Sequence, residues 1–104
     1  MTLEEVLVDA SAPLTETTIE RQFDGSATWS RGGRAFAVVS GDGTVASFSL
    51  DPAVAAAAVR TPDTTESGRG PGWVDFAPVE LDERATDRAA AWLASAYRRL
   101  APRD

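Results

Sequence analysis

Apolar positions follow two different spacings along the chain, and the change of spacing marks where helix gives way to strand. Near the amino terminus Leu3, Val6, Leu7 and Ala10 are separated by three, one and three positions, which places them on one face of an α-helix. Thr2 precedes this stripe and is a favoured N-cap residue. The pattern predicts a short amphipathic helix at the start of the chain.

The carboxyl-terminal segment carries the longest helical pattern. Asp82 supplies an N-cap, Arg98 and Arg99 complement the negative end of the helix dipole, and Pro102 ends the helix. A helix of about five turns is expected. Its broad apolar face consists of Ala85, Ala89, Trp92, Leu93, Ala96, Tyr97 and Leu100.

The segment after the first helix gives no single answer. Pro13 ends that helix, while Thr15, Thr17 and Thr18 are poor residues for a helix interior. Leu14 to Phe23 is compatible with a further helical turn or with a loop, so the conformation of residues 11–26 stays open.

A strand pattern follows. Segments 27–30, 34–40 and 44–50 are rich in β-favouring residues and are separated by glycine-containing turns, as in a three-stranded meander. Alternation places Phe36 and Val38 on one face of the second strand. In the third strand the serines alternate with the apolar residues, which predicts one apolar and one polar face for the sheet.

A short helix and two more strands complete the pattern. An Asp-Pro pair opens the alanine-rich run 53–59, which is composed of strong helix formers. Residues 61–66 predict a fourth strand and residues 73–79 a fifth, in which Pro78 indicates a frayed or edge position.

These elements predict one α+β domain over residues 1–104. It has two layers, an antiparallel five-stranded sheet with helices on one face, in the order α-β-β-β-α-β-β-α.

Charge narrows the choice of partners. Ten arginines oppose 16 carboxylates, with no lysine or histidine, so the net charge is −6 and generic binding to polyanions is disfavoured. Acidic residues near the amino terminus argue against a signal peptide, and the longest apolar run, residues 53–59, is too short to cross a bilayer. We expect a cytoplasmic protein without a membrane segment.

The inventory of reactive side chains disfavours catalysis. Without His, Cys or Lys, the usual general bases, nucleophiles and Schiff-base amines are absent. Asp82, Glu83 and Asp87 form the best acidic cluster, but arginines lie beside them and a solvated charged helix face explains them better than a metal site. We expect no enzyme, no metal and no cofactor.

The stretch GRGPGWVDF, residues 68–76, raises the question of a ligand cradle. Its glycines precede a strand, so they lack the helix dipole and the lysine of a phosphate-binding loop. A hinge in which Pro71 and Gly72 set the direction of Trp73 is the favoured interpretation.

The aromatic residues suggest a binding face. Trp73 has the opposite parity to Val74, and Trp29 lies in the first strand of the meander, so Trp29, Arg34, Arg69 and Trp73 are expected on the open sheet face as a surface for an unknown protein or small-molecule partner. Packing of Trp73 under a loop is the alternative.

Several motifs resemble the MmcQ/YjbR-like family of small bacterial proteins. The family's aromatic, Gly-Gly, cation and hydrophobic-Phe-Ala pattern is matched by Trp29, Gly32, Gly33, Arg34, Ala35, Phe36 and Ala37, and its later features by Pro71, Gly72, Trp73, Val74, Tyr97, Arg98, Ala101 and Pro102. The amino-terminal Leu-Pro-Gly and Trp-Gly-x-Pro segments of the family are not evident here.

The resemblance also implies an alternative function, because members of the family are often labelled DNA-binding. The candidate contacts are local arginine patches, formed by Arg31, Arg34, Arg69, Arg98 and Arg99, with Arg103 near the carboxyl terminus. The acidic net charge and the lack of a recognisable recognition helix argue against this function.

Overall fold

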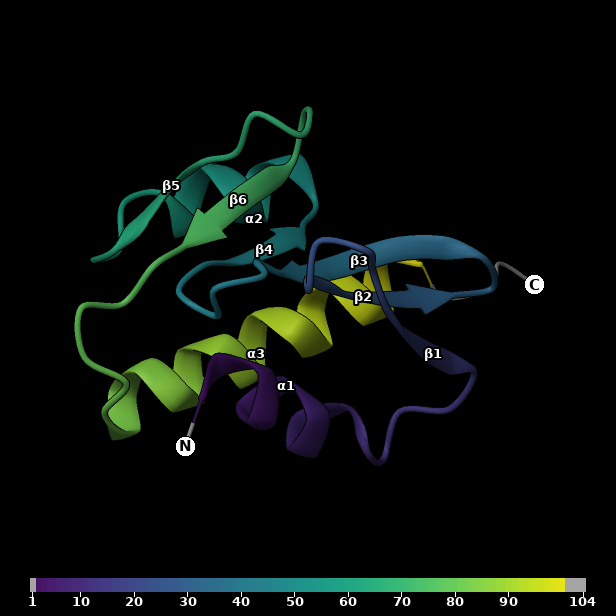
Figure 1. Ribbon diagram of the computed structural model, residues 1–104. Coiled ribbons are helices and arrows are strands. Elements are labelled where there is room, and N and C mark those ends of the chain that lie inside the picture. Colours follow the sequence, from purple (N-terminus) through teal and green to yellow (C-terminus); the bar gives the residue numbers. More distant parts are fainter. Residues whose placement is uncertain (1, 101–104) are drawn as a thin grey trace.

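The computed structural model describes residues 2–100 and shows helices packed beside a single sheet (Figure 1). Within this range three helices and six strands follow one another. They are α1 (Leu3–Ser11), β1 (Thr17–Arg21), β2 (Ala27–Arg31), β3 (Arg34–Val39), β4 (Ala46–Ser49), α2 (Pro52–Ala58), β5 (Thr64–Glu66), β6 (Trp73–Phe76) and α3 (Glu83–Arg99).

The sheet is antiparallel throughout, with strand order β1-β2-β3-β4-β6-β5. The α+β class, the antiparallel sheet and the three predicted helices are confirmed. The predicted number of strands is wrong, because the sheet formed by the described residues has six strands where five were expected.

The additional strand is β1, which lies in the segment that the sequence left between helix and loop. Its threonines and Ile19 are β-branched and favour extended backbone. A tight turn joins β1 to β2: the Gly25 amide donates to the Gln22 carbonyl at 3.0 Å, and Gly25 has φ 89°. The residues of β1 permit an extended backbone, but the segment becomes a strand only by pairing with β2, which its own sequence does not predict.

Helix caps agree with the sequence. Thr2 and Glu5 form a reciprocal capping box at α1, and Asp51 caps α2 ahead of Pro52. The Asp82 carboxylate accepts from the Ala85 amide at the start of α3. Local chemistry therefore fixes where each helix begins.

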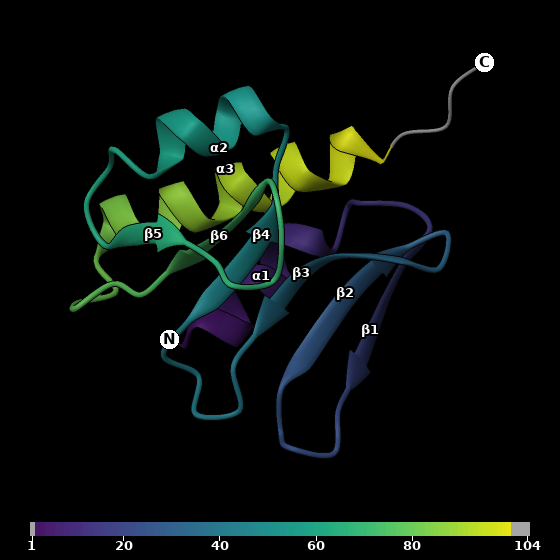
Figure 2. The same cartoon turned by 90° about the horizontal axis from the view of Figure 1, so that it is seen from above.

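The core lies between one face of the sheet and the helices. α3 packs on β3 and β4, α1 packs on α3, and α2 packs on β5 and β6 (Figure 2). Trp92 of α3 contacts Phe48 and Phe76, with ring centroids 6.2 and 5.2 Å apart. All three helices contribute to the same buried cluster as these strand residues.

A bulge in β3 changes the predicted faces of that strand. Trp29 pairs with Ala37 and Ser30 pairs with Ala35, which leaves Phe36 without a partner residue. Phe36 is fully buried and its ring lies edge-on to Tyr97 of α3. The prediction that Phe36 and Val38 share a face is wrong, because the extra residue shifts the alternation.

Trp29 lies in the core and not on the open face. Its side chain is fully buried, and its Nε1 donates to Ser11 Oγ of α1 at 3.2 Å. Ser11 Oγ in turn donates to the Val8 carbonyl. The placement of Trp29 on a partner-binding surface is therefore wrong: pairing with Ala37 turns the ring toward the helices.

The Trp29–Ser11 hydrogen bond generates a first prediction. Ser11→Ala should lower the free energy of unfolding by about 1–3 kcal/mol, because the buried indole N–H loses its acceptor. Urea denaturation measures the loss, with Ser95→Ala, at a half-buried helix position, as the control. In a Trp29→Phe background the Ser11 substitution should have little effect; an equal loss in both backgrounds would contradict the hydrogen bond.

The β3–β4 turn generates a second prediction. The Asp42 carboxylate accepts from Ser40 Oγ at 2.7 Å, from the Thr44 amide at 3.0 Å and from Thr44 Oγ1 at 2.8 Å. These bonds, that from Ser40 first, lower the pKa of Asp42 from 3.8 to about 2. Because the folded pKa is lowered, the turn's contribution to stability is full above pH 3.8 and is lost as the pH falls toward 2.

An NMR titration of the Asp42 carboxyl carbon should give a midpoint near pH 2. Asp42→Asn should destabilise the protein at neutral pH, and its difference from the wild type should shrink on acidification. A midpoint at or above 3.8 would show that the turn does not hold the charged form.

Candidate functional site

The sheet face opposite the buried cluster carries a row of mainly polar residues. Strand pairing aligns Thr28, Val38, Ser47 and Asp75 across β2, β3, β4 and β6. Ser47 Oγ donates to the Asp75 carboxylate at 2.6 Å, which ties the centre of the row together. We call this surface the open face.

The serines of β4 point away from the core, as predicted, but they are not exposed to solvent. Ser47 and Ser49 are 5 and 6% exposed. At the end of α3, Arg99 Nη1 donates to Ser49 Oγ at 3.0 Å. The two serines therefore offer little accessible surface to a ligand.

Trp73 and Arg69 lie together at the border of the open face. Trp73, the first residue of β6, is half-buried, and Arg69 is exposed in the preceding loop. The guanidinium carbon of Arg69 is 5.9 Å from the centre of the Trp73 ring, within the range of a cation–π contact. The structure thus brings together two of the four residues predicted for partner binding.

The glycine loop directs Trp73 as a hinge would. The Gly72 carbonyl accepts from the Leu50 amide at 2.8 Å, which fastens the end of the loop to the end of β4. Gly72 has φ 82°, and a Cβ at this position would lie 2.5 Å from the Leu50 carbonyl oxygen. Only glycine fits this close backbone approach.

A groove of about 450 Å³ lies on the open face between the β1–β2 turn and Arg69. Phe23 in the turn is fully exposed, an unusual position for a phenylalanine ring. The groove is lined by Gln22, Phe23, Asp24, Ser26, Thr28, Val38 and Arg69. It therefore has apolar surface, hydroxyl groups and one charge of each sign.

Asp24 is held in its charged form at this groove. Ser26 donates to its carboxylate through Oγ at 2.6 Å and through the amide at 2.9 Å. These bonds lower the pKa of Asp24, and the positive charge of Arg69 lowers it further by a smaller amount. The groove consequently keeps both charges at neutral pH.

Phe23, Asp24 and Thr28 were not among the predicted site residues. Phe23 lies in residues 11–26, for which the sequence predicted neither strand nor turn. Its exposure was therefore not predicted. The sequence signal that could have found it is the turn Phe23-Asp24-Gly25-Ser26, which places an aromatic residue at a hairpin tip.

Arg34 lies apart from Trp73. It is exposed at the start of β3, next to the β2–β3 turn, where Gly32 and Gly33 have φ 57 and 81°. The two views place this turn and loop 67–72 at separate points of the molecule (Figures 1 and 2). The four-residue cluster predicted from the sequence therefore reduces to Arg69 and Trp73.

Arg31 fastens the β2–β3 hairpin to α3. Its guanidinium carbon lies 3.9 Å from the centre of the Tyr97 ring, and its Nη1 donates to the Tyr97 carbonyl at 3.0 Å. Glu16 Oε2 lies 3.9 Å from Arg31 Nε. With 12% of its side chain exposed, Arg31 has a structural role.

The contacts of Arg31 bring Arg34 and Arg98 to the same end of the molecule. Both residues are exposed, one beside the β2–β3 turn and one in the last turn of α3. Arg69 borders the open face and Arg99 binds Ser49, while Arg103 lies outside the described residues. The predicted nucleic-acid set is thus divided between two parts of the surface.

Within residues 2–100 no group of three or more Asp, Glu, His or Cys side chains is placed to hold a metal ion. Of the helices described, none is long and apolar enough to cross a membrane.

A third prediction compares the loss of stability when Trp29 or Trp73, the two tryptophans expected on the open face, is replaced by alanine. Trp29→Ala should remove about 3–5 kcal/mol of stability, because it empties a fully buried site. Trp73→Ala should remove about 1 kcal/mol, because that ring is only half-buried and its deletion leaves no closed cavity. Thermal and urea unfolding measure both, and a global collapse of Trp73→Ala would assign that ring to the core.

Comparisons of the chain with protein-family models, with curated proteins and with solved structures found no match. The resemblance to the MmcQ/YjbR-like family therefore stays a prediction from the residues quoted for it. Function has to be inferred from the groove and its side chains.

Proposed function

We propose that the protein is a non-enzymatic binding module whose open face docks a segment of a protein partner. The observation that carries the proposal is the groove between Phe23 and Arg69, which combines an unburied aromatic ring with a cation at one concave surface. Aromatic and arginine side chains dominate the energetics of many protein interfaces.

The neighbouring residues favour a partner segment that is apolar and carries a negative charge. The exposed Phe23 ring offers apolar contact, and Thr28 offers a hydroxyl group. Arg69 already stacks near Trp73, so a carboxylate that reached it would meet a guanidinium partly held in place. Asp24 would disfavour an acidic group at the opposite wall and so would set the direction of the segment.

The absence of His, Cys and Lys from the sequence supports a binding role over a catalytic one. Membership of the MmcQ/YjbR-like family is proposed from the motifs that resemble it. A cytoplasmic location is proposed from the acidic amino terminus and the short apolar runs. Both fit a binding module, and neither is needed for the argument from the groove.

DNA binding is a second candidate because of one observation. Arg34 and Arg98 are exposed at the end of the molecule where Arg31 holds the hairpin against α3. Two cations on a protein of net charge −6 are a small electrostatic footprint for contacts to phosphate. The groove therefore supports protein docking better.

Peptide selection tests the docking proposal directly. Random peptides displayed on phage and selected on the wild-type protein should yield sequences with an apolar residue near an acidic one. Phe23→Ser and Arg69→Ala should each weaken binding of the selected peptides about tenfold in fluorescence polarisation.

Val79→Ser is the matched control, because Val79 is 95% exposed and lies outside the groove lining. It should leave the affinity unchanged. Selection of no peptide, or peptides whose binding ignores Phe23 and Arg69, would contradict the proposal.

A salt titration separates the second candidate. A fluorescent DNA duplex should show no binding at ~50 mM salt if the groove binds protein alone. Binding that falls steeply by ~200 mM and is lost in Arg34→Ala with Arg98→Ala would establish phosphate contacts at the hairpin end.

A further inference from the structure

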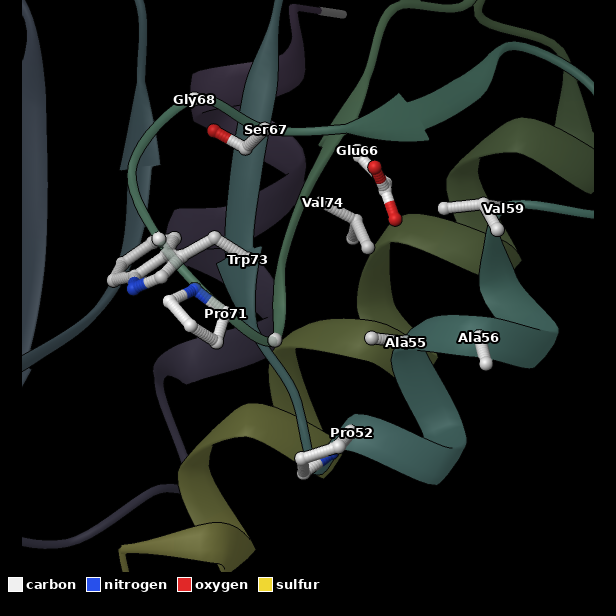
Figure 3. Close-up of a pocket in the computed structure, with 12 residues that line it drawn as sticks. Pro52, Ala55, Ala56, Val59, Glu66, Ser67, Gly68, Pro71, Trp73 and Val74 are labelled. Carbon is white, nitrogen blue, oxygen red and sulfur yellow. The ribbon is translucent and has the colours of Figure 1, made fainter.

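A second pocket of about 450 Å³ lies on the other side of the glycine loop, between α2 and the β5–β6 hairpin (Figure 3). Its volume is within the range of small-molecule sites. Ala55 and Ala56 of α2, with the C-cap residue Val59, form one wall, and Val74 of β6 and the loop residues form the other.

Glu66 supplies the one ionisable side chain in this lining. It pairs with Val74 of β6, so its side chain projects to the same face of the sheet as α2, and it is exposed to solvent at the mouth of the pocket. Figure 3 shows the Glu66 carboxylate between Val74 and Val59 in this view. The ion pairs within residues 2–100 are Arg21–Glu4 and Arg31–Glu16, so Glu66 takes part in none of them.

Trp73 does not share this side. It is one of the lining residues, but its parity is opposite to that of Val74, and its ring lies beside Pro71, away from Ala55 and Val59 (Figure 3). The pocket and the groove of the open face are therefore separate surfaces.

We propose that this pocket between α2 and the β5–β6 hairpin binds a small organic monocation, an ammonium group carried on a compact apolar body. The apolar body fits against Ala56 and Val59, and the ammonium group meets the Glu66 carboxylate. A carboxylate without a protein cation beside apolar walls is complementary to such a ligand in both charge and polarity.

The same lining disfavours an anion. It contains no arginine, and the nearby Arg69 points its guanidinium toward the Trp73 ring. A phosphate would meet Glu66 with like charge, so the glycine loop forms part of a pocket without being a phosphate cradle.

A pair of similar ligands tests the proposal. Phenethylammonium, titrated into ¹⁵N-labelled protein, should shift the amide signals of α2 and of residues 66–74 with a dissociation constant of about 1 mM. Its neutral analogue 2-phenylethanol should bind about tenfold more weakly, because Glu66 gains no charge-assisted hydrogen bond from it.

Two substitutions in the pocket lining test the proposal, and each has a control that makes the same change of residue outside the lining. Glu66→Gln should weaken phenethylammonium about tenfold and leave 2-phenylethanol unchanged, while Glu20→Gln, on the opposite edge strand, should alter neither. Ala56→Leu should block both ligands by filling the wall, whereas Ala57→Leu, exposed on α2 and outside the lining, should not.

Equal binding of the two ligands, shifts that map elsewhere, or an unchanged affinity in Glu66→Gln would overturn the proposal. So would the absence of any shift at ~20 mM ligand. Because Glu66 and Ala56 lie outside the groove lining, these results are independent of the peptide-docking test.

Discussion

The structure depends on the burial of one sheet face under α3. Trp92 and Leu93 of that helix can be covered only if the apolar residues of the central strands point the same way, and Phe48 and Phe76 do so. With no cysteine in the chain, this packing, together with that of α1 and α2, must hold the fold. The bulge at Phe36 follows from the same requirement, since it adds one more aromatic ring to the buried side.

Concentrating the large apolar side chains on one face leaves the other face available for binding. The row from Thr28 to Asp75 is mainly polar, and its hydroxyl and carboxylate groups bond to one another at the centre. The exposed aromatic and charged side chains gather instead at the border, where Phe23 and Arg69 lie in loops and Trp73 begins β6. Loops on a rigid sheet can vary in sequence without disturbing the core, which suits them to recognition.

The arginines show how one residue type takes different roles in one small protein. Arg31 packs on Tyr97 and joins a hairpin to a helix, and Arg21 pairs with Glu4 of α1 at 2.6 Å. Arg69 instead stays exposed beside an aromatic ring. A guanidinium can either join elements of the fold or lie exposed on an aromatic ring, because it is planar, always charged and able to stack. The number of arginines in the sequence does not separate those that hold the fold together from those that stay exposed.

By itself the sequence determined the helices, their caps, the antiparallel class and the direction of Trp73, because each depends on spacing or chemistry within a few residues. Tertiary structure decided the rest. β1 exists because β2 pairs with it, Trp29 is buried because its partner Ala37 turns it toward α1, and Phe23 becomes a groove wall only when its hairpin meets the loop of Arg69. Strand pairing and loop convergence join residues far apart in the chain, and a local pattern carries no record of such contacts.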